Sequence, residues 1–106
     1  MRMPVMPIAL LSVCLQAPTA QGQEVRAQRG YTLAQTHCAS CHAIGPVGES
    51  ALGSAPPFRT LHRRYPVESL AESLAEGIVT GHPRMPQFQL DVAQIGDLIA
   101  YLKLLE

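Results

Sequence analysis

Two cysteines and a histidine lie within five positions of one another, in the stretch Cys38-Ala39-Ser40-Cys41-His42. Two thiols at this spacing can form a redox disulfide or supply half of a zinc site, and Cys-x-x-Cys-His is also the attachment sequence of a c-type haem. In the haem interpretation each thiol adds to one vinyl group, and the adjacent imidazole becomes an axial ligand of the iron. Each interpretation needs different partners, so the remaining residues decide between them.

The redox and zinc interpretations find little support in the rest of the chain. Thioredoxin-like Cys-x-x-Cys sites occur in a βαβ context, and no strand-like alternation is visible here. A structural disulfide stays open, although it leaves His42 without a role. A closed zinc site takes four ligands, and the remaining candidates, His62 and His82, form no second pair at short spacing.

A second axial ligand at long range distinguishes the haem interpretation from the others. After the first twenty residues the chain holds one methionine, Met85, which lies between Pro83 and Pro86. Methionine more often fills gaps in a core, but two prolines restrict this loop and would hold a thioether in place. His/Met ligation raises the reduction potential of a haem. We therefore predict His42 and Met85 as the iron ligands, with His82 as the rival to Met85.

The first twenty residues have the layout of a secretory signal. Arg2 precedes the apolar run of residues 5–15, and small residues then lead into the polar stretch QGQE. The run is about half of the ~20 residues that a membrane-spanning helix needs. We expect a signal peptide at residues 1–20, with an approximate cleavage point, and a mature domain at 21–106. A leader retained as a membrane anchor stays open.

Charge and size narrow the function classes further. Seven basic and eight acidic side chains follow position 20, which gives a net charge of −1. Nucleic-acid binding normally shows a clear positive excess, so no nucleic-acid partner is expected. The chain has no tryptophan and five other aromatic residues. A domain this small is marginal on its own core, so we expect a bound cofactor to fill its centre.

Apolar periodicity predicts three helices and no strand, hence an all-α domain. The first helix spans about 24–38 and leads into the cysteines. The second begins after Pro66 and ends near 80–81. Glycines and prolines in the stretch 43–65 argue against regular structure there.

The last helix has the clearest signals. Asp91 is a good N-cap, and Gln94 three residues later completes a capping-box pattern. Apolar residues then recur at helical spacing. The predicted stripe contains Val92, Ile95, Leu98, Ile99, Leu102 and Leu105.

The chain resembles the small class I cytochromes c over nearly all of the region after the leader. Gly30 precedes Cys38 by eight residues, as in the first helix of that family, and CASCH matches its attachment site. MPQF at 85–88 resembles the methionine loop, and DLIAYLK at 97–103 resembles the C-terminal helix. The resemblance implies three to four helices wrapped around one covalently attached haem c, with the first and last helices crossing near Gly30 and Tyr101 packing at the crossing.

The resemblance also implies contacts around the haem. A proline carbonyl after the attachment site would accept the ring N–H of His42, which fixes the tautomer and raises the basicity of the ligand. Gly45-Pro46 has the expected residue pair and Pro56 the better spacing, so both stay open, with Pro56 preferred. Among nearby donors, Arg59 is the residue we predict at a haem propionate, and the alternatives are Arg63, Arg64 and Tyr65.

The expected function is electron transfer in the bacterial periplasm. One His/Met-ligated haem would carry single electrons between redox proteins that dock transiently, with no small-molecule substrate and no enzymatic turnover. The alternative is a gas sensor or peroxidase-like haem protein, which requires a displaceable sixth ligand. We expect His37, His62 and His82 to be surface residues.

Overall fold

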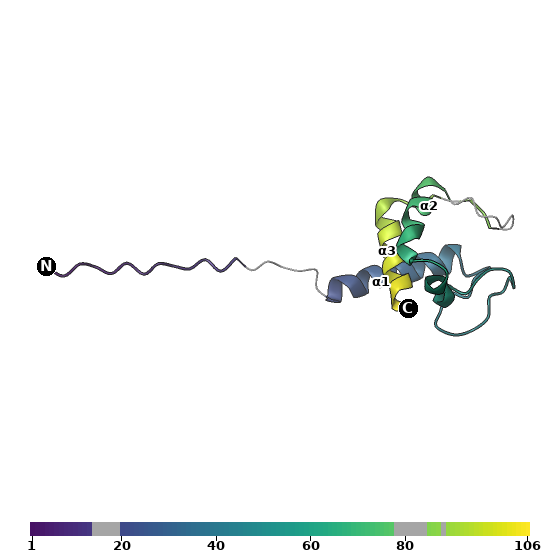
Figure 1. Ribbon diagram of the computed structural model, residues 1–106, viewed down its shortest axis with the longest axis horizontal. Helices are drawn as coiled ribbons and strands as arrows, with labels where there is room; N and C mark the ends of the chain where they lie inside the picture. Colours follow the sequence, from purple (N-terminus) through teal and green to yellow (C-terminus); the bar gives the residue numbers. More distant parts are fainter. Residues whose placement is uncertain (14–19, 78–84, 88) are drawn as a thin grey trace.

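The computed structural model describes residues 1–13, 20–77, 85–87 and 89–106. In chain order its elements are α1 (Ala20–His37), the 3-10 helices η1 (Phe58–Arg63) and η2 (Val67–Ser69), α2 (Leu70–Glu76) and α3 (Val92–Leu104) (Figure 1). Among these residues no strand is present. The all-α class predicted from the sequence is therefore confirmed.

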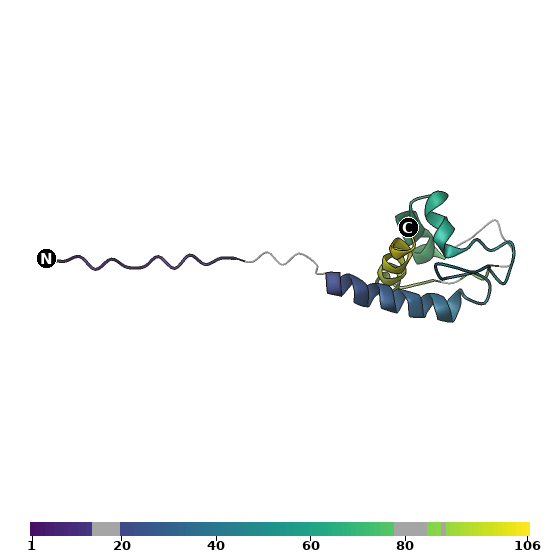
Figure 2. The ribbon, with the colours of Figure 1, turned by 90° about the horizontal axis from the view of Figure 1, so that it is seen from below.

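Helices α1 and α3 cross in close contact (Figure 2). A Cβ atom added to Gly30 would lie 2.0 Å from the backbone oxygen of Asp97 and 2.9 Å from Cβ of Tyr101. Real Cβ atoms do not approach that closely, so only glycine permits this approach of the two backbones. The predicted crossing at Gly30 and Tyr101 is confirmed.

The buried face of α1 consists of small residues, Ala27, Gly30 and Ala34. These residues leave room for the neighbouring helix, and an ion pair closes the crossing from outside. Arg29 donates two hydrogen bonds to the Asp97 carboxylate, of 3.0 and 3.3 Å.

Helix α1 begins at Ala20, four residues before the predicted start. It therefore includes the polar segment QGQE, which the prediction left outside the helix.

Helix α3 begins with the predicted capping box. The Asp91 carboxylate accepts from the Gln94 backbone N–H at 2.8 Å, and the Gln94 side chain accepts from the Asp91 N–H at 3.1 Å. The buried residues of α3 are Ile95, Leu98, Tyr101 and Leu102. Including Val92 in the apolar stripe was wrong, because this first helical residue is 87% exposed.

The middle of the chain differs from the prediction in two ways. The stretch 43–65 contains a 3-10 helix, η1, which buries Phe58 and Leu61. After Pro66 the chain forms η2 before α2, and α2 ends at Glu76 rather than near 80–81. Gly77 ends it at a φ of +91°, a left-handed conformation that favours glycine. Residues 78–81 themselves lie outside the described part of the chain.

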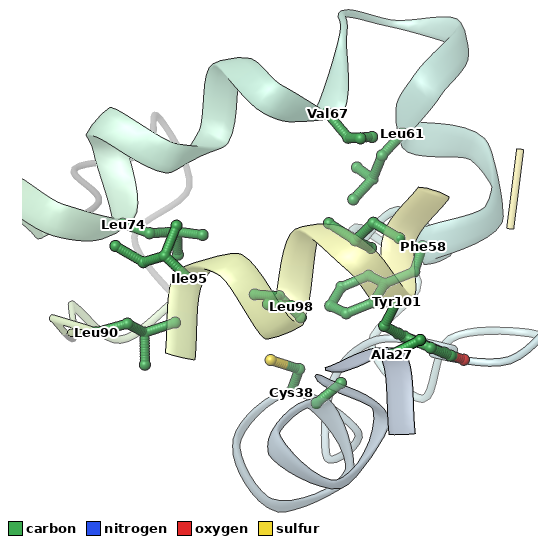
Figure 3. Packing of buried hydrophobic residues seen from close by; sticks show 12 residues of the cluster. Ala27, Cys38, Phe58, Leu61, Val67, Leu74, Leu90, Ile95, Leu98 and Tyr101 are labelled. Carbon is green, nitrogen blue, oxygen red and sulfur yellow. The ribbon is translucent and has the colours of Figure 1, made fainter. Parts of the chain in front are cut away.

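One hydrophobic cluster joins these elements (Figure 3). Phe58, Leu61 and Val67 from the two 3-10 helices and Leu74 from α2 pack with the apolar face of α3. Cys38, directly after α1, belongs to the same cluster. The first cysteine of the motif is therefore part of the core.

The N-terminal segment 1–13 contains neither helix nor strand, and its side chains are exposed. Within the described ranges, no helix is both long enough and apolar enough to cross a membrane.

Candidate haem-binding site

The cysteines and the histidine lie on one turn of chain that continues from α1. The Cys38 N–H bonds to Ala34 O at 2.8 Å, which extends the hydrogen-bond pattern of the helix. Cys38 O then accepts from the N–H of Cys41 at 3.2 Å and of His42 at 2.9 Å. One hydrogen-bonded turn therefore carries both thiols and the imidazole.

Both cysteines are free thiols. Cys38 is 8% exposed, and burial raises the pKa of its thiol to about 11. Cys41 is half-buried. No group of three or more Cys, His, Asp or Glu side chains that could hold a metal ion occurs in the described ranges, and His82 of the zinc interpretation lies outside them.

The His42 ring is held from one side by the loop that follows it. Nδ1 of His42 lies 2.8 Å from the backbone oxygen of Pro56. A carbonyl oxygen only accepts, so Nδ1 is the donor and Nε2 keeps the lone pair that can bind a metal. The Phe58 ring packs on the imidazole with centroids 5.1 Å apart. Pro46, the other proline considered, is exposed.

Backbone and side-chain hydrogen bonds close the loop that carries Pro56. The Leu52 N–H bonds to Cys41 O at 3.0 Å, and the Phe58 N–H bonds to Ala43 O at 2.9 Å. The hydroxyl oxygen of Ser50 accepts from the Ala43 N–H at 2.9 Å. These bonds return the chain to His42 after fourteen residues.

A cavity of about 420 Å³ opens beside the turn. Protein sites for cofactors and small ligands have volumes of roughly 300–1,000 Å³. Its walls are mostly apolar and include Leu52, Phe58, Leu61, Leu70, Leu74, Leu98 and Leu102, and both cysteines, His42 and Met85 line it too. Thiols, an imidazole and a thioether therefore share one apolar cavity, and this donor set fits a covalently attached haem.

Met85 reaches this cavity from the segment between α2 and α3. The Leu90 N–H bonds to Leu74 O at 3.1 Å, and the Gln89 amide bonds to Ala75 O at 3.3 Å. A Cβ added to Gly77 would lie 3.0 Å from the Gln87 amide nitrogen. The end of α2 thus supports the Met85 segment on its C-terminal side. His82 and Pro83 lie outside the described residues.

Three side chains after the loop differ in their positions. The Arg59 guanidinium donates to the backbone oxygen of Gly48 at 2.7 Å, and Arg59 is not on the cavity wall. Arg64 and Tyr65 do line the cavity. Burial raises the pKa of Tyr65, and Arg64 partly offsets this. The propionate contact of Arg59 stays a prediction, and of the alternatives named from the sequence, Arg64 and Tyr65 line the cavity whereas Arg63 does not.

Comparison with known proteins agrees with this site. The family model for cytochrome c matches residues 27–106, so the chain belongs to the cytochrome c family. It is also 33% identical over 101 residues to cytochrome c-552 of Bradyrhizobium diazoefficiens, with 92% of this chain and 95% of the relative covered. No solved structure matches significantly.

Family membership settles the cofactor. The protein is an electron-transfer haem protein that binds haem c covalently, and Cys38 and Cys41 fit the attachment motif of the family. The iron of such a group changes between the ferric and ferrous states by one electron.

Proposed function

We propose that the protein is a periplasmic electron carrier whose single haem is ligated by His42 and Met85. The observation that carries the proposal is the shared cavity, which both side chains line together with the two cysteines. A carrier needs both axial positions filled by the protein so that little rearranges when the electron moves. Ligation by one imidazole and one thioether meets this requirement and favours a high potential.

The chain's own residues would supply three things to the haem. Cys38 and Cys41 hold it through thioether bonds, and Pro56 O fixes the His42 tautomer with the lone pair on Nε2. The apolar cavity walls exclude water, and this stabilises the reduced state, which carries one positive charge fewer. Arg59, Arg64 or Tyr65 would contact the propionates.

The absence of turnover is part of the proposal. A gas sensor or peroxidase-like enzyme requires a sixth position that opens, whereas Met85 lines the cavity from a segment bonded to α2. The partners would be redox proteins that dock transiently through a small interface. No small-molecule substrate and no nucleic acid are expected.

We also propose that residues 1–20 direct export to the periplasm and are then removed. The apolar side chains of the first thirteen residues are exposed, including Ile8 at 89% and Leu10 at 91%. Large exposed apolar surfaces mark interaction sites, and the charge and length of this segment fit recognition by an export machinery.

The test uses the full-length gene expressed in a host that matures c-type haems. The proposal predicts one haem per chain that resists extraction by acid-acetone, a low-spin spectrum, and reversible one-electron titration. Reduced protein should not bind carbon monoxide. A high-spin spectrum or ready carbon monoxide binding would make the gas-sensor or peroxidase-like function the better one.

A further inference from the structure

Tyr101 connects the helix crossing to the loop that follows the attachment site. Its hydroxyl donates a hydrogen bond to the backbone oxygen of Ile44, 57 residues earlier in the chain. Its ring meets the ring of Tyr31 edge-on, with centroids 5.4 Å apart. Since its Cβ also lies beside Gly30, Tyr101 is held at both ends.

The Ile44 carbonyl is two residues beyond His42 and belongs to the hydrogen-bonded loop. Ala43 O, one peptide earlier, accepts from the Phe58 N–H at 2.9 Å. Phe58 is two residues beyond Pro56, whose carbonyl oxygen lies on Nδ1 of His42. The Tyr101 hydroxyl thus bonds to the segment of the loop that contains Ile44, and the opposite segment of the same loop, which contains Pro56, positions the His42 ring.

Tyr101 itself does not line the cavity, whereas Leu98 and Leu102 of the same helix do. Removing its hydroxyl therefore deletes no atom from the wall of the haem site, so an effect on the site must pass through the loop. Burial, with a contribution from Tyr31, raises the pKa of Tyr101, so its hydroxyl stays protonated and able to donate.

We propose that Tyr101 is a positioning residue for His42: its hydroxyl holds the Ile44 carbonyl and so keeps Pro56 O on the imidazole N–H. The inference rests on the proposed ligation of the iron by His42. The Nδ1–H···O bond raises the basicity of the imidazole. A more basic ligand stabilises the ferric state, so a looser loop raises the reduction potential.

The variant Tyr101→Phe keeps the ring and removes the donor. The net free energy of one such hydrogen bond corresponds to roughly a twofold to tenfold change in an opening equilibrium. We expect hydrogen exchange of the Phe58 amide and of His42 Nδ1–H to accelerate by that factor in the reduced holoprotein. The reduction potential should rise while the low-spin spectrum is retained.

Tyr31→Phe is the matched control. Tyr31 belongs to the same ring pair, and its hydroxyl bonds to no residue in the described part of the chain. This variant should keep the exchange rates and the potential of the wild type. Equal exchange rates and equal potentials in the two variants, or a lower potential in Tyr101→Phe, would overturn the inference.

The two readouts also separate this inference from the proposed function. Amide exchange at Phe58 reports on the loop and does not depend on which residue binds the iron. The wild-type spectrum and its response to carbon monoxide report on ligation alone. Faster exchange in Tyr101→Phe with an unchanged potential would show that the hydroxyl is only structural, and would overturn the positioning role.

Discussion

Gly30 and Asp97 approach so closely that a Cβ on Gly30 would lie 2.0 Å from the Asp97 backbone oxygen. The contact is between two helix backbones, so no side-chain rotation can relieve it. Because Cys38 follows α1 by one residue, the same contact fixes where the attachment turn lies relative to α3.

Gly30→Ala should therefore destabilise the protein strongly. Overpacking typically costs 1–3 kcal/mol, and a backbone contact should reach about 3 kcal/mol or more. Gly96→Ala is the matched control, because its Cβ would meet only the movable tip of Arg26, at 2.5 Å. That variant should be neutral or stabilising by up to ~1 kcal/mol, the helix preference for alanine. Urea unfolding of both holoproteins measures the difference, and equal losses would contradict the tight crossing.

Gly77→Ala should weaken the support of Met85. Gly77 has a φ of +91° and lies against Gln87, so alanine strains the backbone and moves the Met85 segment. The cost should be about 1–3 kcal/mol, and carbon monoxide binding to the reduced protein should become measurable.

The control for this variant is Gly48→Ala, which also has positive φ, +99°, but meets nothing within 4 Å. It should lose stability through backbone strain without gaining carbon monoxide binding. If the two variants respond alike to carbon monoxide, the support of Met85 by the end of α2 is wrong.

Removing the charge of Arg64 should lower the reduction potential. A positive charge on the cavity wall favours the reduced haem, which carries one positive charge fewer. Arg64→Gln should therefore shift the potential downward, and the shift should shrink as salt is added. Arg63→Gln, an exposed neighbour that does not line the cavity, should leave it almost unchanged.

Arg59→Gln decides between the two roles open to Arg59. If Arg59 bonds only to Gly48, the variant should be less stable and its reduction potential should change little. A downward shift as large as that of Arg64→Gln would instead place Arg59 at a propionate.

The proposed leader predicts the mass of the exported protein. Intact mass spectrometry of periplasmic material should give a chain that begins near Gln21 and carries one haem. A chain that still contains Met1, recovered from the membrane fraction, would show that the segment is retained as an anchor.

Local sequence patterns predicted the features that depend on residues close together in the chain. The attachment motif is continuous, so its three residues must share one turn, and the Asp91–Gln94 capping box is complete within four residues. Proline on both sides is the local signal that singles out Met85 as the proposed second ligand.

Features that depend on packing could not be predicted in the same way. The buried face of α1 consists of Ala27, Gly30 and Ala34, which carry little hydrophobic signal, whereas the more apolar Val25 is 53% exposed. Val92 fits the periodicity of α3 but lies on its first position, beyond the reach of the core. No sequence signal distinguishes Arg59 from Arg64 as a propionate contact. Only the fold shows that Arg59 bonds to Gly48 and that Arg64 lies on the cavity wall.

Ligation of the iron by Met85 is the central claim, and carbon monoxide binding to Met85→Ala tests it most directly. Val47→Ala is the control, because Val47 is 80% exposed and does not line the cavity. The account predicts that the wild type and Val47→Ala do not bind carbon monoxide when reduced and show the weak far-red methionine–iron band when oxidised. Met85→Ala should bind carbon monoxide readily and lose the band. Carbon monoxide binding by the wild type, or an unchanged far-red band in Met85→Ala, would contradict the claim.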